Sequence, residues 1–197
     1  MRVRPKGMPI VMYLGRNIKE YLENGESEIK RALSAGEICC DLCLKRQRYH
    51  SQYNRTIKET GEELTIIVVW CRRCKKWHSL QPDFLLSPKH YSGNEIECVV
   101  IDSANEPVSH IETQASESTV RRWIRDVGAG IVGAVGNLKF HFGRAGHAVN
   151  EIAITPGHCY DELEQILELA PYEMDCCGNK LGLANMWLRS MGAMAYI

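Results

Sequence analysis

Two pairs of cysteines, each with two residues between its members, are the side chains best suited to chemistry. Cys40 pairs with Cys43, and Cys71 pairs with Cys74. Two thiolates on one tight turn can both bind Zn²⁺ at about 2.3 Å, and two such turns complete a closed tetrahedral site. The spacing therefore predicts one structural zinc ion. Four protein ligands leave no open coordination position, so we expect no metal-based catalysis at this site.

Other ligand sets remain open. Cys39 lies beside Cys40, although it does not give the two-residue gap, and His78 could replace one cysteine. The chain has nine cysteines, an odd number, and its start lacks the apolar segment of a signal peptide. Both features favour reduced thiols in the cytoplasm, and hence metal binding, over the rival interpretation of disulfides or core thiols.

The segment between the pairs reads as a β-hairpin. Residues 49–58 and 63–70 form the two predicted strands, joined by a turn at 59–62. Leu64, Ile66, Val68 and Trp70 alternate with Thr65, Ile67 and Val69, which is interpreted as the period of a strand. Such a hairpin brings its ends together and carries both cysteine pairs to one point, which is the arrangement of a zinc ribbon.

Charge is unevenly distributed over the 197 residues, although the formal net charge is zero. Residues 39–78 carry nine basic and four acidic side chains, and residues 116–149 carry five and two. Two basic regions are expected where separate surfaces contact phosphate. The alternative is ordinary solvation of exposed faces. No apolar run is long enough to predict a membrane span.

A three-helix unit is predicted after the ribbon. Ser92 and Glu95 form a capping box for a first helix that ends near Ala104. Pro107 suits the first turn of a second helix. Ser116 or Ser118 begins a third helix, whose apolar positions follow helical spacing.

The last two helices match a helix-turn-helix, in which the third helix would read the DNA major groove. Its outward side chains are the expected DNA contacts: Ser118, Thr119, Arg121, Arg122 and Arg125. The alternative is a plain three-helix bundle with an arginine-rich solvent face.

Several of these stretches together resemble a known family. They are both Cys-x-x-Cys pairs with His78, the linker 80–86 with Pro88, Tyr91-Ser92, and the helix 116–123. Over residues 38–128 the chain is similar to uncharacterised bacterial zinc-ribbon plus helix-turn-helix proteins, which look like the DNA-binding part of transposases and are associated with mobile elements. The resemblance implies that Cys40, Cys43, Cys71 and Cys74 bind zinc and that Arg121, Arg122 and Arg125 face DNA.

The predicted fold class is α+β, mostly α: a zinc-ribbon hairpin, a three-helix unit and a helical C-terminal region. The expected domains are an N-terminal arm and helix (1–37), the ribbon (38–87), the helix-turn-helix (88–128) and the C-terminal helices (129–197). Gly128, Gly130 and Gly133 match a dinucleotide motif, but no strand precedes them, so that interpretation is rejected. His158, Cys159, Cys176 and Cys177 are interpreted as core or surface residues and not as a second metal site.

Together these features predict a non-enzymatic, sequence-specific double-stranded DNA-binding protein of the cytoplasm and nucleoid. It would be a transcriptional regulator or the site-recognition component of a mobile element, alone, as a homodimer, or with a transposition or transcription protein, and with no membrane contact. Phosphate contacts are assigned to the basic side chains of the ribbon: Lys45, Arg46, Arg48, Arg72, Arg73, Lys75 and Lys76. The alternative is an adaptor for a larger DNA- or RNA-processing enzyme; RNA binding by the ribbon is disfavoured.

Overall fold

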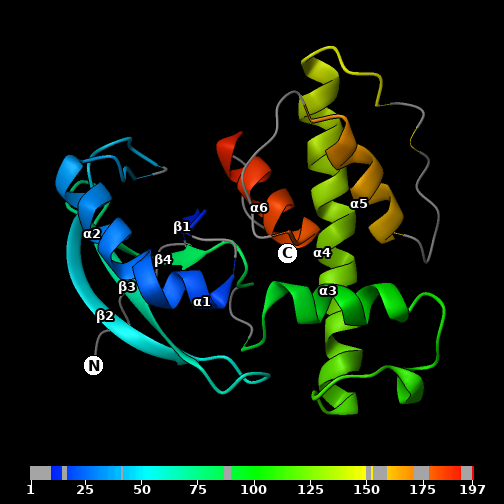
Figure 1. The fold of residues 1–197 in the computed structure, drawn as a ribbon. Coiled ribbons are helices and arrows are strands. Elements are labelled where there is room, and N and C mark those ends of the chain that lie inside the picture. The colour runs from blue at the N-terminus through cyan, green and yellow to red at the C-terminus, as the bar shows by residue number, and fades with distance from the viewer. Residues whose placement is uncertain are drawn as a thin grey trace. The chain divides into compact units, whose positions relative to one another are not determined.

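The computed structural model describes residues 10–14, 17–40, 42–86, 90–149, 152, 159–170, 178–191 and 197. The chain divides into two compact units, unit 1 (residues 1–83) and unit 2 (residues 84–197) (Figure 1). Within the ranges given above, no helix combines the length and the apolar character needed to cross a bilayer.

Unit 1 is built on a four-stranded mixed sheet with the strand order β1-β4-β3-β2. The strands are β1 (Ile10–Met12), β2 (Arg48–Thr56), β3 (Glu63–Cys71) and β4 (Lys76–Pro82). β2, β3 and β4 pair antiparallel, whereas β1 lies parallel to β4 with Ile10 opposite Leu80. The sheet therefore joins the start of the chain to the strand that follows the second cysteine pair.

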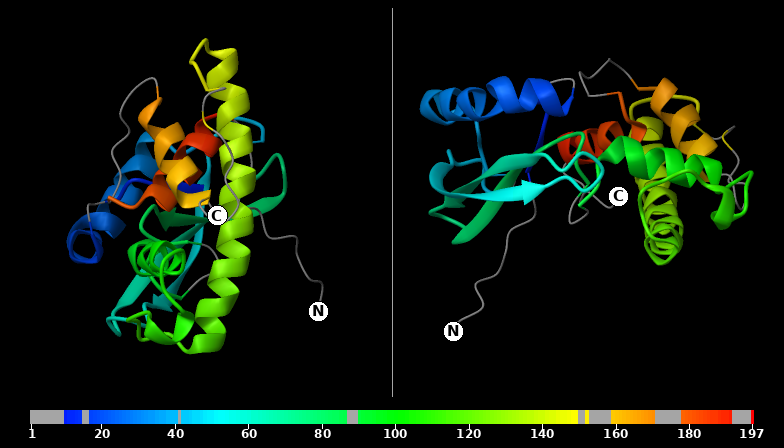
Figure 2. Two further views of the ribbon diagram at one scale, coloured as in Figure 1. Left: turned by 90° about the vertical axis from the view of Figure 1, so that its right-hand side faces the viewer. Right: turned by 60° about the horizontal axis from the view of Figure 1, so that its bottom comes forward.

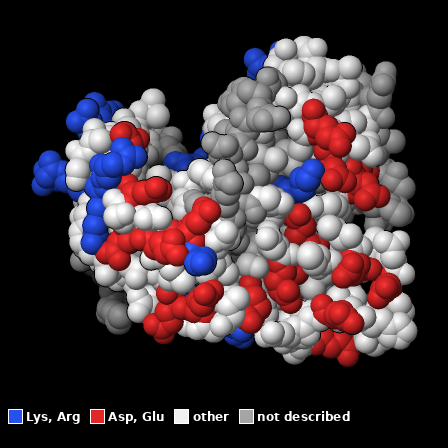
Figure 3. Space-filling view, viewed as in Figure 1, with Lys and Arg blue, Asp and Glu red and all other residues white. Residues whose placement is uncertain are grey.

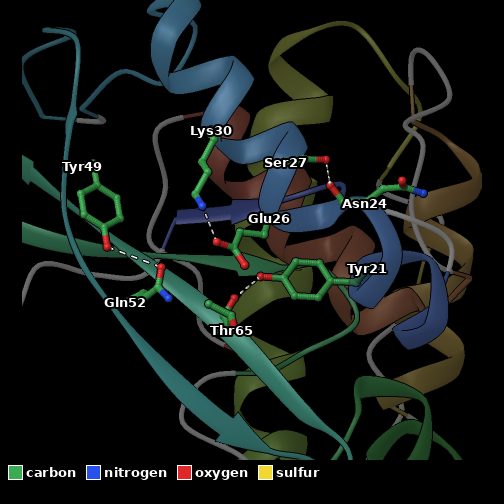
Figure 4. A network of polar contacts seen from close by, with 8 residues as sticks. All are labelled: Tyr21, Asn24, Glu26, Ser27, Lys30, Tyr49, Gln52 and Thr65. Atoms are coloured by element: carbon green, nitrogen blue, oxygen red, sulfur yellow. Dashed lines mark hydrogen bonds and ion pairs between the residues drawn. The ribbon is translucent and has the colours of Figure 1, made fainter.

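One long helical segment lies over one face of this sheet (Figure 2). It runs from α1 (Ile18–Glu20) through a π-helical turn, η1 (Tyr21–Gly25), into α2 (Glu26–Ala35). Ile29 of α2 is fully buried. The Tyr21 hydroxyl donates a 2.6 Å hydrogen bond to the Thr65 carbonyl of β3 (Figure 4). A Cβ on Gly25 would lie 2.4 Å from the Tyr21 ring, so the glycine gives that ring room to reach the sheet.

Unit 2 is helical and centres on α4 (Glu117–Arg144), a helix of 28 residues. Against it pack α3 (Gly93–Asp102), α5 (Cys159–Glu168) and α6 (Lys180–Ser190), with a short 3-10 turn, η2 (Val108–His110), before α4. The buried face of α4 includes Trp123, Ile131 and Leu138. Trp123 meets Tyr91 edge to face at 4.8 Å, so Trp123 is a core residue.

The predicted fold class is wrong, because the β structure is a four-stranded sheet and not an isolated hairpin. β2 and β3 were predicted to within one or two residues, but β1 and β4 were not predicted. β4 is short, ends at Pro82, and has a polar sequence; His78 and Leu80 are buried only because the neighbouring strands and the helix cover them. The parallel pairing of β1 with β4 joins distant segments and leaves no local pattern.

The three-helix unit is also corrected. Ser92 does cap the first helix, since its hydroxyl accepts from the Glu95 amide at 3.2 Å. The second predicted helix is only the 3-10 turn η2, and residues 103–116 form a connection far longer than the turn of about three to four residues in a helix-turn-helix. The third helix does not stop at residue 128. Ile131 and Leu138 extend its buried stripe, and this packing outweighs the low helix propensity of the glycines between them.

A buried carboxylate ties three helices of unit 2 together. Glu97 on α3 accepts a 3.0 Å hydrogen bond from the Leu181 amide in the first turn of α6, and it also bonds to the Tyr160 hydroxyl on α5. Burial raises the pKa of Glu97, and these hydrogen bonds oppose the increase only in part. The ionised carboxylate therefore costs folding free energy, while the hydrogen bonds that it accepts orient α6.

Glu97→Gln tests the cost of this charge. Because the folded-state pKa of Glu97 is raised, the wild type loses stability as pH rises above the ordinary glutamate range. Glutamine keeps an acceptor without this charge, so the variant should be more stable than wild type at pH 7 and equally stable at acidic pH. Urea denaturation across pH measures both.

Glu97→Ala is the matched control for the hydrogen bonds. It removes the acceptor, so it should destabilise the protein by about 1–3 kcal/mol at acidic pH, and by less at pH 7, where it also removes the cost of the buried charge. Identical pH profiles for wild type and Glu97→Gln would contradict the assigned cost.

Candidate metal centre

The first cysteine pair is placed by the end of α2. The helix stops at Gly36, whose φ of 74° lies in the left-handed region, and the Glu37 amide donates back to the Ala32 carbonyl. The positive φ favours glycine at this position, and the Arg46 side chain packs against it, with Nε 2.6 Å from where a Cβ would lie. Cys39 then pairs with Arg46 in an antiparallel bridge, which forms a small hairpin around Cys40 and Cys43.

The second pair lies in the connection between β3 and β4, and its backbone repeats that of the first. The Leu44 amide donates to the Cys40 carbonyl at 2.8 Å, and the Lys75 amide donates to the Cys71 carbonyl at 2.9 Å. Leu44 and Lys75 have φ values of 57° and 56° and, within the described residues, are the non-glycine positions with positive φ. Sequence analysis did not single them out. The sequence signal that could have identified them is their position directly after the second cysteine of each pair.

The four cysteine sulfurs form one cluster. Sγ of Cys40 lies 3.8 Å from Sγ of Cys74, and Sγ of Cys43 lies 3.5 Å from Sγ of Cys71. All four sulfurs lie within 4.8 Å of one another. A tetrahedral ion with metal–sulfur distances of about 2.3 Å has sulfur–sulfur edges of about 3.8 Å. The cluster therefore has the size and donor set to hold a metal ion.

The electrostatics of the thiols also fit a cation. Burial raises the pKa of Cys71, but the hydrogen bond from the Cys74 amide and the neighbouring thiols lower it to about 7. The hydrogen bond with Cys43, burial and the other thiols raise the pKa of Cys74 to about 12. The Cys71 thiol therefore loses its proton more easily than an ordinary cysteine, whereas the Cys74 thiol loses its proton less easily. A bound cation removes this conflict, because it stabilises all four thiolates together.

The two rival ligands lie outside the four-sulfur group. Cys39 directs its sulfur toward the Gly36 carbonyl, 4.0 Å away. His78 is buried on β4, and its Nε2 lies 4.0 Å from Sγ of Cys40. His78 is therefore placed next to a ligand and can support that sulfur from outside the coordination shell. Cys98 and Cys159 of unit 2 are not in the cluster, and His158, Cys176 and Cys177 lie outside the described residues.

The predicted phosphate contacts of the ribbon surround this cluster. Arg72, Arg73 and Lys75 are exposed on the second cysteine turn, and Lys76 is half-buried at the start of β4. None of the four forms an ion pair with another described residue. Figure 3 shows basic side chains at the end of unit 1 where α2 ends, whereas acidic side chains lie over α3 and α5 of unit 2.

The predicted DNA contacts on α4 are differently placed. Ser118 and Thr119 bond through their hydroxyls to Ser116 at 3.1 and 2.9 Å. Arg121 pairs with Glu117 at 2.5 Å, and Arg125 pairs with Asp126 at 2.8 Å. Arg122 is exposed and, within the part of the chain that the structure describes, forms no ion pair. The positive charge of the first turns of α4 is thus partly neutralised within the helix.

Comparison with known protein families gives a match over part of the chain. Residues 40–123 match a family model described as "Domain of unknown function (DUF6431)". The matched stretch is under half of the chain; it begins at Cys40 and ends at Trp123, so it includes all four clustered cysteines, β2 to β4 and the start of α4. No curated protein and no solved structure shows a significant match.

Removing one ligand should abolish metal binding. Cys71→Ser is expected to reduce the bound divalent metal from one ion per chain to none, measured by elemental analysis. The binding free energy of a closed four-cysteine site is on the order of 10–16 kcal/mol, so unit 1 should lose its β-sheet circular dichroism. Cys98→Ser, which removes an exposed thiol of unit 2, should change neither. Full β structure in a metal-free sample would contradict this assignment.

The left-handed residue at Leu44 gives a second test. Its side chain is 79% exposed, so Leu44→Gly loses little packing and relieves a backbone cost of about 1–2 kcal/mol. We expect stabilisation by up to about 1 kcal/mol in urea at constant metal concentration, because glycine also gains unfolded-state entropy. Leu44→Val should destabilise. Equal destabilisation by both variants would show that this turn is not left-handed.

Proposed function

We propose that this protein is a non-catalytic, zinc-containing DNA-binding protein and that the cysteine-turn end of unit 1 holds the duplex backbone. Zinc is the metal of choice because a closed set of four cysteine ligands is typical of structural zinc sites. Such an ion keeps no open position for a substrate, so its role is to fix the two turns.

The observation that carries the proposal is an excess of basic side chains at this end of unit 1; Asp41, between Cys40 and Cys43 in the sequence, is the acidic residue of the two cysteine turns. Residues 42–58 and 64–82 contain no Asp or Glu. The exposed members form no ion pair with any residue in the described ranges: Lys45, Arg46, Arg48, Arg72, Arg73 and Lys75. Within one protein, unpaired like charges repel. A polyanion turns this repulsion into attraction, since each contact releases condensed counterions.

Arginine in four of these six positions favours phosphate recognition, because its planar fork can donate two hydrogen bonds to one phosphate. Backbone contacts of this kind fix a protein on the duplex but do not read sequence. Base recognition is assigned to the start of α4, where Arg122 is exposed beside the hydroxyls of Ser118 and Thr119. A role as a transcriptional regulator or as the site-recognition component of a mobile element is consistent with both surfaces.

Salt dependence tests the proposal. Binding to a duplex should weaken steeply between 50 and 200 mM salt, measured by fluorescence anisotropy. Arg72→Ala with Arg73→Ala should make the log–log slope less negative by about 1.8, at about 0.9 for each lost phosphate contact. Arg31→Ala is the matched control: Arg31 is also an exposed arginine of unit 1, but it pairs with Glu37 at 3.4 Å.

The control variant should bind DNA as the wild type does, and both variants should keep their metal. Affinity that does not change with salt, or an equal loss in Arg31→Ala, would overturn the proposal.

A further inference from the structure

The face of the sheet opposite to α2 carries an aromatic cluster at its end near the cysteine turns. Tyr49 and Gln52 lie beneath Lys30 and Glu26 of α2, so they mark the covered face (Figure 4). Tyr49 pairs with Val69, and successive side chains of a strand alternate between faces. Trp70 therefore points to the opposite face. On that face Leu64 and Ile66 are buried farther along β3, whereas the side chains around Trp70 are half-buried or exposed.

Three rings from three strands meet on this face. Trp70 of β3 is directly opposite Trp77 of β4, and their ring centroids are 5.4 Å apart. His50 of β2 lies 5.1 Å from Trp77. The rings are tilted by 48° and 49°, so they do not cover each other face to face. Both tryptophans are half-buried and His50 is exposed, which leaves aromatic surface in contact with solvent.

Positive charge borders the cluster. Arg48 is exposed and pairs directly with Trp70 across the β2–β3 ladder, so both side chains are on the face opposite to α2. Arg72 and Arg73 follow Trp70 by two and three residues, on the cysteine turn. An apolar protein partner would not favour this many unpaired arginines. An aromatic surface beside cations suits a ligand with flat rings joined by phosphates.

We infer that His50, Trp70 and Trp77 form a stacking platform for unpaired bases of single-stranded DNA, with Arg48 holding the adjoining phosphate. This inference rests on the proposed function and extends it from the duplex backbone to exposed bases. Every base has a π face, so such a platform tolerates different sequences. It would let the protein hold a melted or displaced strand next to the duplex that the cysteine-turn end contacts.

Tryptophan fluorescence reports on this face. The other two tryptophans, Trp123 and Trp187, are 1% and 3% exposed in the core of unit 2. Quenching by a ten-residue oligo(dT) should therefore come from Trp70 and Trp77. The decisive comparison is an abasic oligomer of the same length, which has the same phosphates but no bases. The wild type should bind it about 5- to 150-fold more weakly, the range for one stacked base.

Variants locate the effect. Trp77→Ala should lose about 5- to 150-fold in oligo(dT) affinity, whereas Trp77→Phe should keep most of that affinity. His50→Ala, a change at an exposed residue, should also weaken oligo(dT) binding. Tyr49→Ala is the matched control, because Tyr49 is 52% exposed on the α2-covered face, and it should bind as wild type. Metal content and circular dichroism check that each variant is folded. If Trp77→Ala does not fold, the abasic comparison and His50→Ala decide.

The outcomes separate this inference from the proposed function. Equal binding of oligo(dT) and the abasic oligomer, or an equal loss in Tyr49→Ala, would overturn the platform while duplex binding by the arginines persists. Tighter binding of oligo(U) than of oligo(dT) would overturn the assignment to DNA. If Trp77→Ala loses oligo(dT) but keeps the duplex, both proposals are supported; absence of all duplex binding would refute the proposed function alone.

Discussion

The four-sulfur cluster is the constraint on which the rest of unit 1 depends. It joins the turn after α2 to the turn between β3 and β4, two segments that otherwise meet through short backbone pairings. Thiolates this close repel one another, and the pKa values of Cys71 and Cys74 are shifted in opposite directions, to about 7 and about 12. A bound ion resolves this conflict and so links the folding of the sheet end to metal binding.

The same centre explains how so much positive charge can gather at one end of a small unit. A divalent ion with four thiolates carries two net negative charges, and basic side chains on both cysteine turns surround it. With the proposed zinc bound, the centre would offset part of the repulsion among these residues and hold them in place. Exposed arginines on a rigid support lose less freedom on binding phosphate than they would on a loop.

Much of the metal centre could be predicted from the sequence, because each Cys-x-x-Cys pair is a local pattern whose two cysteines are the expected metal ligands. β2, β3 and the Ser92 cap were predicted for the same reason. The sheet was not predicted, since β1 pairs with β4 across most of unit 1. Pro107 suggested a second helix, but the structure has only the 3-10 turn η2 there. α4 continues beyond residue 128 because burial of its apolar side chains outweighs the low helix propensity of its glycines. The aromatic face became visible only once β4 placed Trp77 opposite Trp70.

X-ray absorption spectroscopy of the purified protein at the zinc edge tests the central claim most directly. The account predicts one zinc ion per chain with four sulfur neighbours at about 2.3 Å. A spectrum with oxygen or nitrogen ligands in place of the sulfurs of Cys40, Cys43, Cys71 and Cys74, or a folded protein without bound metal, would contradict it.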